Sequence, residues 1–177
     1  MIMVKTTNLG KNRPLKILTY PDKGLRGKAA KVDIEKQLIE IQHLVDLMFK
    51  TIKFYQGIGL AAPQVGVHYQ VAIVDIDDGN PLTLINPEII KIEEEVESYE
   101  GCLSFPHIQA YVPSFNKIDV RFWDYDGVEK TIGVDGLLAR CIYHEINHLN
   151  GILFIDGMSN MKRDMIIKTM KKRKGLV

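Results

Sequence analysis

The chain is short of cysteine, of net charge and of long apolar runs, and each shortage excludes a class of protein. With only Cys102 and Cys141 among 177 residues, it cannot contain a disulfide framework, and a reducing compartment leaves both thiols free. The formal net charge is +1, so the overall charge indicates no partner. No stretch approaches the roughly 20 apolar residues that span a bilayer, and the first residues lack the apolar segment of a secretory signal. We therefore expect a cytoplasmic protein that binds neither membrane nor DNA.

The remaining composition is that of an ordinary globular protein. Hydrophobic residues make up 46% and charged residues 25% of the chain, which is typical of a domain with a packed core. The length suits one domain, and no repeat or linker divides the sequence. We expect a single domain over residues 1–177, of which residues 1–13 form a loose polar arm.

Three segments have the patterns of helices. After Asp33, which is expected to be the N-cap, apolar residues recur at helical spacing over residues 34–52. Asp135 is expected to cap a second helix that ends near Gly151. A third, basic helix is predicted over residues 160–177.

Short strands are predicted between the first two helices. The runs QVAIVDI, LTLINPEIIKIE and KIDVRFWDYDGVEKTIGV are of β type, and the pair Asp126-Gly127 marks a hairpin turn. The resulting fold class is α+β: mixed or antiparallel β-sheets packed around a central helix, with one helix in the N-terminal half and one at the C-terminus.

The stretch YHEINHLNG, residues 143–151, indicates that this central helix binds a metal. His144 and His148 are one turn apart, so both imidazoles project from one face and could meet a single ion. A metal held in this way binds water and lowers its pKa, and Glu145 beside it could carry the proton. The alternative interpretation is a buried helix whose histidines are hydrogen-bonded core residues. Most protein sites of this type have three ligands, so a third must come from elsewhere.

Several residues are candidates for the third ligand: Cys102, His107, Cys141, Asp156 and His68. Cys141 is expected to line the pocket as a small buried residue, and Asp156 has a short side chain at a distant position. Cys102, in YEGCLSFP, lies at a predicted strand end next to Gly101, where a nearby ion would hold it as thiolate. Taken alone, a single cysteine is more often a core residue.

The stretch GIGLAAPQVG, residues 57–66, has two possible roles. Its small residues let a backbone approach another chain closely, and Gln64 offers an amide that can donate to a developing oxyanion. The alternative is a turn that requires a positive φ. No Lys-Ser/Thr pair follows, and GIG does not follow a strand and open a helix, so phosphate and dinucleotide loops are excluded.

Together GIGLAAPQ, EGCLS and HEINH, in this order and spacing, resemble the three motifs of the peptide deformylases. LKILTYPD, INPEI and HLNGILFID resemble that family too, so the similarity covers nearly the whole chain. The resemblance implies a metallohydrolase, a single catalytic domain that removes the formyl group from the N-terminal formyl-methionine of new polypeptides and releases formate.

The resemblance also implies a ligand set. By position, Cys102, His144 and His148 would bind one divalent metal ion, Fe²⁺ in the cell, with zinc, nickel or cobalt as substitutes. Oxidation of iron or of the Cys102 thiol would inactivate such a site, so oxygen sensitivity is expected.

The catalytic and substrate-binding residues follow by the same resemblance. Glu145 would be general base toward the metal-bound water and then general acid toward the departing amine. Gln64 and the backbone N–H of Leu103 would stabilise the oxyanion. Substrate contacts are expected from Ile58 and Gly59, which would pair with the peptide backbone as an added strand, and from Glu100, Gly101, Leu137 and Cys141.

Two departures from the family pattern concern residues around the site. Asn147 stands where an aspartate is usual, and Gln109 and Ser114 stand where many members have arginines. We interpret Asn147 and Ser114 as replacing an ion pair at both ends, which leaves the fold intact but the helix orientation less firmly set. The loss of arginine at Gln109 affects substrate contacts more than chemistry.

The C-terminal segment indicates a possible partner. Residues 162–174 contain seven Lys or Arg and one acid, Asp164. A solvated helix end is one interpretation, since cations are favoured near a helix C-terminus. The other is binding to ribosomal RNA, which the resemblance also suggests.

Alternative functions remain open at this point. A zinc endopeptidase of the HExxH type would need a ligand downstream of His148 and would not need Cys102. An inactive relative would bind only metal or the ribosome. We expect a monomer of bacterial type, with phage or organellar origin as further possibilities.

Overall fold

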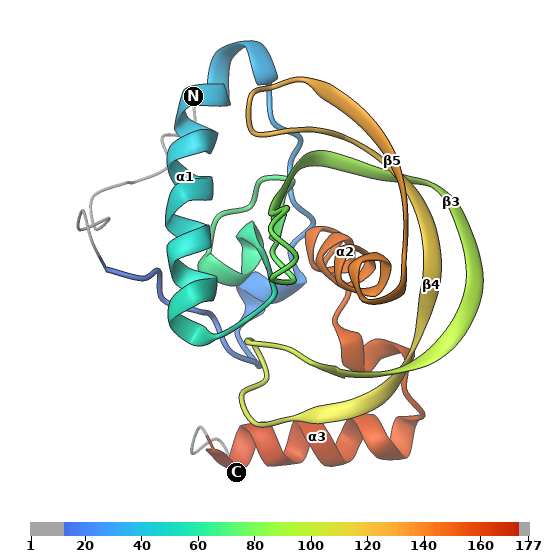
Figure 1. Ribbon diagram of the computed structural model, residues 1–177. Coiled ribbons are helices and arrows are strands. Elements are labelled where there is room, and N and C mark those ends of the chain that lie inside the picture. Colours follow the sequence, from blue (N-terminus) through green and yellow to red (C-terminus); the bar gives the residue numbers. More distant parts are fainter. Residues whose placement is uncertain (1–12, 174–177) are drawn as a thin grey trace.

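The computed structural model describes residues 13–173, in which helices and strands form an α+β arrangement (Figure 1). In chain order the helices, with 3-10 helices marked η, and the strands are η1 (Lys23–Arg26), α1 (Ile34–Tyr55), β1 (Gly59–Ala61), η2 (Ala62–Val65), β2 (Val71–Val74), β3 (Leu82–Gly101), β4 (Gln109–Trp123), β5 (Glu129–Asp135), α2 (Gly136–Leu149), η3 (Phe154–Gly157) and α3 (Asn160–Arg173). Apart from residue 13, the arm expected at residues 1–13 lies outside the described residues, as does the end of the third predicted helix after residue 173.

The five strands form one antiparallel sheet in the order β1-β2-β3-β4-β5. β3 pairs with β2 only over its first residues, Leu82–Ile85, whereas it pairs with β4 as far as Gly101. Beyond Ile85, one edge of β3 therefore pairs with no other strand of residues 13–173. The long strands β3, β4 and β5 curve around α2 (Figure 1), and the predicted α+β class with a central helix is confirmed.

Two helices bury apolar stripes on either side of this framework. The predicted spacing in α1 is confirmed, since Ile41, Val45 and Met48 are all buried and pack with residues of β1 and β2. α2 buries Ile142 and Leu149 against the concave side of the long strands. Burial of such side chains contributes about 1.5–3 kcal/mol each, so α2 is held firmly against the sheet.

The two expected N-cap residues are confirmed, since Asp33 directly precedes α1 and Asp135 directly precedes α2. Neither side chain makes a capping hydrogen bond. The Asp33 carboxylate instead accepts a hydrogen bond from Lys36 Nζ at 2.8 Å, because this charged donor is a stronger partner than the neutral backbone N–H groups. α1 ends at Tyr55, where Gln56 takes a left-handed conformation with φ 55°.

The predicted hairpin turn is confirmed between β4 and β5. Gly127 has φ +74°, a conformation that L side chains rarely adopt. The Asp124 carboxylate accepts hydrogen bonds from the backbone N–H groups of Asp126 and Val128 and so fixes the turn.

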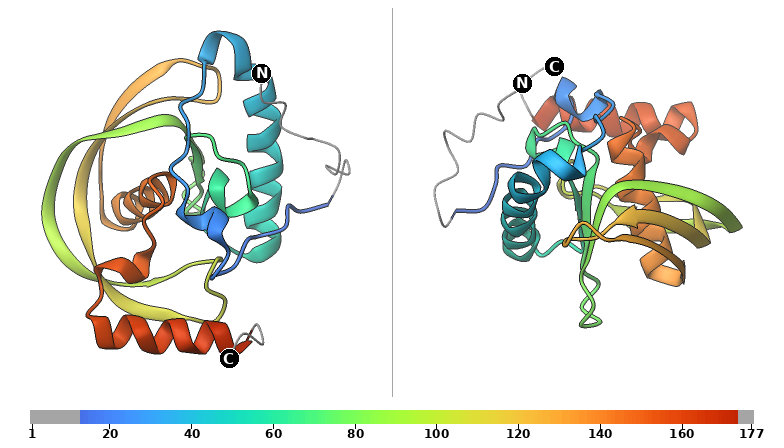
Figure 2. Two further views of the ribbon diagram at one scale, coloured as in Figure 1. Left: turned by 180° about the vertical axis from the view of Figure 1, so that it is seen from behind. Right: turned by 90° about the horizontal axis from the view of Figure 1, so that it is seen from above.

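The third helix lies against the lower part of the sheet (Figures 1 and 2). Its residue Met170 is buried in a cluster with Phe105 and Val112. Near its end, Arg173 Nη1 donates a hydrogen bond to the Pro106 carbonyl at 2.6 Å. Within residues 13–173, no helix is long and apolar enough to cross a bilayer.

Candidate active site

The structure brings three potential metal ligands together from two distant segments. Cys102 follows directly after β3, and His144 and His148 lie one turn apart on α2. The Cys102 Sγ atom is 3.2 Å from His148 Nε2. One ligand atom of each of the three residues lies within 4.8 Å of the others. Two ligands of one tetrahedral zinc, with bonds of about 2.3 Å to sulfur and 2.0 Å to nitrogen, are roughly 3.5 Å apart. The three side chains therefore fit one small divalent ion.

The two imidazoles are held differently. His144 Nδ1 is 2.9 Å from Glu100 Oε2, which leaves Nε2 of His144 for an ion. Such a carboxylate contact fixes the tautomer and orientation of a ligand histidine. His148 is 1% exposed, and its Nδ1 has no hydrogen-bond partner among the described residues.

Burial and neighbouring groups shift the pKa values of both histidines in opposite directions. Burial alone would lower the pKa of His144, but its hydrogen bonds to Cys102 and Glu100 raise it well above the ordinary value. Burial, and then the charge of His144, lower the pKa of His148 well below the ordinary value. A neutral His148 has a free lone pair, which is the form that binds a metal.

Glu145 is a buried carboxyl directly beside the triad. It is 4% exposed, and burial raises its pKa to about 7. Its Oε2 atom has no hydrogen-bond partner among the described residues. A carboxyl with a pKa near neutrality can both accept and return a proton, as a general acid–base group must.

The backbone of β1 comes very close to this carboxyl. A Cβ atom added to Gly59 would lie 2.5 Å from Glu145 Oε1 and 2.8 Å from Cys141 Sγ. Only glycine fits there, so this part of the GIGLAAPQVG stretch approaches α2 of the same chain closely.

Gln64 extends from η2 toward the thiol. Its Nε2 donates to Ser104 Oγ at 3.2 Å and to Cys102 Sγ at 3.5 Å, while its Oε1 accepts from Ala61 N–H at 2.8 Å. These bonds fix the amide with its donor side toward the triad. The backbone N–H of Leu103 makes no hydrogen bond among the described residues. Both groups are donors that a developing oxyanion could use.

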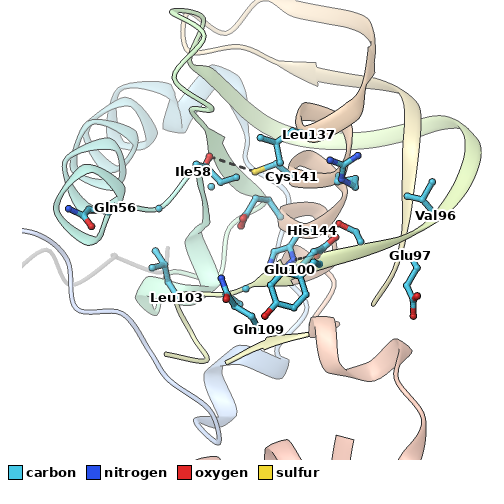
Figure 3. Close-up of a pocket in the computed structure, with 18 residues that line it drawn as sticks. Gln56, Ile58, Val96, Glu97, Glu100, Leu103, Gln109, Leu137, Cys141 and His144 are labelled. Atoms are coloured by element: carbon cyan, nitrogen blue, oxygen red, sulfur yellow. Dashed lines mark hydrogen bonds and ion pairs between the residues drawn. The ribbon is translucent and has the colours of Figure 1, made fainter. Parts of the chain in front are cut away.

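A cleft of ≈ 820 Å³ opens beside the triad (Figure 3). It is lined by all six predicted substrate contacts, namely Ile58, Gly59, Glu100, Gly101, Leu137 and Cys141, and also by Cys102, Leu103, His144 and Glu145. Gln64 and His148 do not line it and lie behind this surface. Cys141 is buried and its Sγ is 3.6 Å from the Ile58 carbonyl; burial raises the pKa of its thiol.

The other candidates for third ligand are engaged elsewhere or lie outside the triad. The Asp156 carboxylate forms an ion pair with Arg26 and accepts from Leu153 N–H. His68 lies beside Gly24 and Gly27. Among the described residues, the metal-ligand geometry is found only for Cys102, His144 and His148.

Sequence analysis missed several residues that line the cleft. Val96 and Ser98 belong to β3, and Arg140 belongs to α2. Arg140 is four residues before His144, so the helical spacing that paired the two histidines would have found it. The alternation of β3, counted back from Glu100, would have found the other two.

The departures from the family pattern coincide with unpaired polar atoms. Ser114 is 1% exposed and its hydroxyl has no partner among the described residues, and neither has Glu100 Oε1. Asn147 and Glu100 both line a second cavity of ≈ 170 Å³ that also touches His144. Gln109 lines the main cleft, which agrees with its expected effect on substrate contacts.

Comparisons with known proteins agree with this geometry. The family model described as polypeptide deformylase matches residues 14–164. The peptide deformylase of Chromohalobacter salexigens is 46% identical over 162 residues, which cover 90% of this chain and 94% of the relative.

Solved structures give the same result. The peptide deformylase of Legionella pneumophila has a TM-score of 0.84 and 40% identity, covering 93% of this chain and 97% of that one. The enzyme of Ehrlichia chaffeensis in complex with actinonin has a TM-score of 0.84 and 42% identity, covering 90% and 97%. A probable peptide deformylase of Synechococcus phage S-SSM7 has a TM-score of 0.76 and 40% identity, covering 81% and 99%.

Proposed function

The chain belongs to the polypeptide deformylase family, and on this premise we propose which of its groups hold the metal and which carry out the hydrolysis. As a member of this family it is a hydrolase that removes the formyl group from formyl-methionyl nascent peptides and releases formate. The observation that carries the assignment is the meeting of Cys102, His144 and His148 beside the buried Glu145. A single catalytic domain over residues 1–177 is part of the proposal.

The three residues of the triad would hold one divalent ion. Bound there, the ion would supply a Lewis acid for the formyl oxygen and lower the pKa of water. A thiolate with two imidazoles suits iron, zinc, nickel and cobalt, and we assign Fe²⁺ in the cell, with the other three as substitutes. Oxidation of the Cys102 thiol would remove a ligand.

Glu145 is the proton carrier in this proposal. Its carboxylate takes a proton from the attacking water and returns it to the departing amine, so the released N-terminus leaves as a neutral amine. The pKa of about 7 supports both steps, because neither protonation state is strongly favoured at neutral pH. Gly59 leaves the carboxyl free to reach the scissile bond.

Gln64 and Leu103 stabilise the oxyanion that forms at the formyl carbon. The Gln64 amide is already oriented by Ala61 and Ser104, so only its long 3.5 Å contact with Cys102 Sγ has to be exchanged. The Leu103 N–H, which makes no hydrogen bond in the described part of the chain, is a second donor. Each donor of this kind contributes roughly 3 kcal/mol to the transition state.

The peptide lies in the cleft in this scheme. Ile58 and Gly59 pair with its backbone from the β1 side, and Gly101 and Glu100 line the other side at the end of β3. Leu137 and Cys141 contact its side chains from α2.

The partners and location follow from the substrate. A monomer acting in the cytoplasm, where nascent chains carry the formyl group, is the simplest arrangement. The basic face of α3 is a candidate contact for ribosomal RNA, because its exposed lysines Lys162, Lys168 and Lys172 project from a helix that lies apart from the cleft.

The two other functions fit less well. An HExxH endopeptidase needs a ligand downstream of His148, and the Asp156 carboxylate is bound to Arg26. An inactive relative would have no use for a buried Glu145 with a raised pKa.

One assay tests the assignment directly. Protein prepared without oxygen should release formate from formyl-Met-Ala-Ser, with the formyl-free peptide as the blank. A matched Glu145→Gln protein should bind the same amount of metal and release almost no formate. Equal formate release by both proteins would refute the proposed role of Glu145.

A further inference from the structure

Two polar side chains, Ser98 of β3 and Arg140 of α2, line the same cleft as the triad. On β3, Val96, Ser98 and Glu100 are turned inward, whereas Glu97 between them is exposed. Figure 3 shows Val96 and Glu97 pointing to opposite sides of this strand. Ser98 is 9% exposed, and its hydroxyl has no hydrogen-bond partner among the described residues.

Arg140 lines the cleft from α2. It shares the cleft-facing stripe of the helix with Leu137, His144 and Glu145, because these residues recur at helical spacing. Its Nη1 donates to Asn116 Oδ1 at 2.6 Å, and Asn116 in turn donates to Glu94. No carboxylate of the described residues forms an ion pair with Arg140. Among the described residues, only Asn116 accepts from the guanidinium of Arg140. One of the five N–H donors of this guanidinium is therefore engaged, and the other four are available to a ligand.

The position of Arg140 selects the part of the substrate that it can meet. It precedes His144 by four residues, about 6 Å along the helix axis. The formyl carbon has to lie beside His144 and Glu145, so the nearest part of a bound peptide is its first side chain.

That side chain is methionine, whose thioether is only a weak acceptor. A wholly apolar pocket would suffice for the methionine side chain and would reject a polar derivative of that side chain. Oxidation to methionine sulfoxide turns the same side chain into a polar one with a strong acceptor oxygen. Burying that oxygen without a donor is costly, whereas burying it against Arg140 and Ser98 is not.

Resting on the proposed function, we propose that Arg140 and Ser98 form a donor pair for the first side chain of the substrate, so that the enzyme also deformylates peptides that begin with formyl-methionine sulfoxide. A neutral acceptor is favoured over an acidic one, since Glu100 also lines the cleft and its carboxylate would repel a negative charge.

The test compares three peptides, formyl-X-Ala-Ser, in which X is methionine, norleucine or methionine sulfoxide. Norleucine has the shape of methionine and no acceptor. The measured quantity is the ratio of kcat/KM for the sulfoxide peptide to kcat/KM for the norleucine peptide, determined on the metal-loaded enzyme. Arg140→Met should lower this ratio roughly tenfold or more, and Ser98→Ala should lower it by a smaller factor.

The matched control is Arg121→Met. Arg121 is an exposed residue of β4 that pairs with Glu88, so the variant removes the same charge away from the cleft. The ratio should stay unchanged in this variant. If Arg140→Met does not fold, Arg140→Lys replaces it; the lysine keeps the charge but offers fewer donors in a different geometry, so an intermediate fall is expected.

The outcomes separate this inference from the assigned activity. If the enzyme released formate from none of the three peptides, the assigned activity itself would be refuted. Suppose instead that formate is released normally from the methionine peptide and that the ratio of kcat/KM for the sulfoxide peptide to kcat/KM for the norleucine peptide is the same in wild type and Arg140→Met. This result would overturn only the inference. An equal fall in Arg121→Met would also overturn it, since the effect would then reflect overall charge.

Discussion

The Sγ atom of Cys102 lies 3.2 Å from Nε2 of His148, although 46 residues separate them in the chain. The end of β3 and the second half of α2 meet at this point, because β3 and β4 curve around the helix. A site that needs a ligand from each segment can form only when the sheet and helix are packed together, so metal binding and folding are coupled here.

Replacing Cys102 by serine should weaken metal binding by roughly 100-fold or more, because a thiolate ligand is lost and a hydroxyl is a poor substitute. Zinc and cobalt affinities measured by competition with a chelator would show this. Cys141→Ser is the matched control, since Cys141 is the only other cysteine and lies outside the triad. Full metal affinity in Cys102→Ser would instead favour an endopeptidase-type site without a cysteine ligand.

Replacing Glu145 by glutamine should lower kcat by about 10²–10⁴, the usual contribution of general acid–base catalysis. The amide keeps the shape of the carboxyl, and metal content should therefore be retained. Steady-state formate release and metal analysis on the same preparation give both quantities. A loss of metal in parallel with the loss of kcat would mean that Glu145 serves the site by packing rather than by proton transfer.

The same carboxyl makes the stability of the metal-free protein depend on pH. The pKa of Glu145 is about 7 in the folded protein, above its ordinary value of 4.5, because burial favours the neutral form. Its contribution to stability is therefore complete below about pH 4.5 and is lost as the pH rises through 7, with a total on the order of 3 kcal/mol.

Unfolding by urea at several pH values, for wild type and Glu145→Gln, would measure this difference. The free energy of unfolding of the variant minus that of wild type should rise between pH 4.5 and 7 and then level off. A difference that is independent of pH would show that Glu145 titrates normally in the folded protein.

Much of the site was predictable from the sequence because local geometry determines it. The spacing of His144 and His148 alone places both on one helical face, and the apolar stripe of α2 fixes which face is buried. Cys102 is different, since no local rule joins residue 102 to residue 148. That contact depends on the curvature of β3, and only the resemblance to a family selected Cys102 from the five candidates.

Other details of the structure were not predicted, also for local reasons. Asp33 is the expected N-cap of α1, but its carboxylate accepts from the neighbouring Lys36 ammonium and not from the first-turn N–H groups. Arg140 and Ser98 were missed because a charged helix residue and a strand serine are usually solvent-facing, and only the packing of α2 inside the curved strands turns them toward the cleft.

Asn147 and Ser114 provide a test of the environment of the metal ligands. The Ser114 hydroxyl and Glu100 Oε1 are buried without partners within residues 13–173, and Asn147 shares a cavity with Glu100 and His144. The double variant Asn147→Asp with Ser114→Arg should bring an ion pair to this cavity and orient α2 more firmly.

We expect the metal affinity of the double variant to rise by roughly tenfold, measured by chelator competition, and neither single variant to give this gain. Each single variant serves as the control for the other, because an ion pair requires both changes. Unchanged affinity in the double variant would show that the cavity does not influence the ligands.

The basic helix α3 can be tested without removing it. Truncation at Asn160 would expose the cluster around Met170, which is 2% exposed, and would break the bond from Arg173 to the Pro106 carbonyl. Loss of ribosome binding after truncation could then come from a damaged fold. Reversing the charge of the exposed residues Lys162, Lys168 and Lys172 to glutamate leaves both contacts in place.

If α3 binds ribosomal RNA, the triple variant should lose co-sedimentation with ribosomes, while formate release from a short peptide stays unchanged because these lysines do not line the cleft. Wild-type binding should weaken steeply as salt rises, since each phosphate contact releases condensed counterions, and the salt dependence should be shallower in variants with fewer lysines.

A matched triple reversal on the far α1, at Lys36, Lys50 and Lys53, controls for net charge. Equal loss of binding in both triple variants would mean that the ribosome attracts the whole protein by charge and that α3 is not a specific contact.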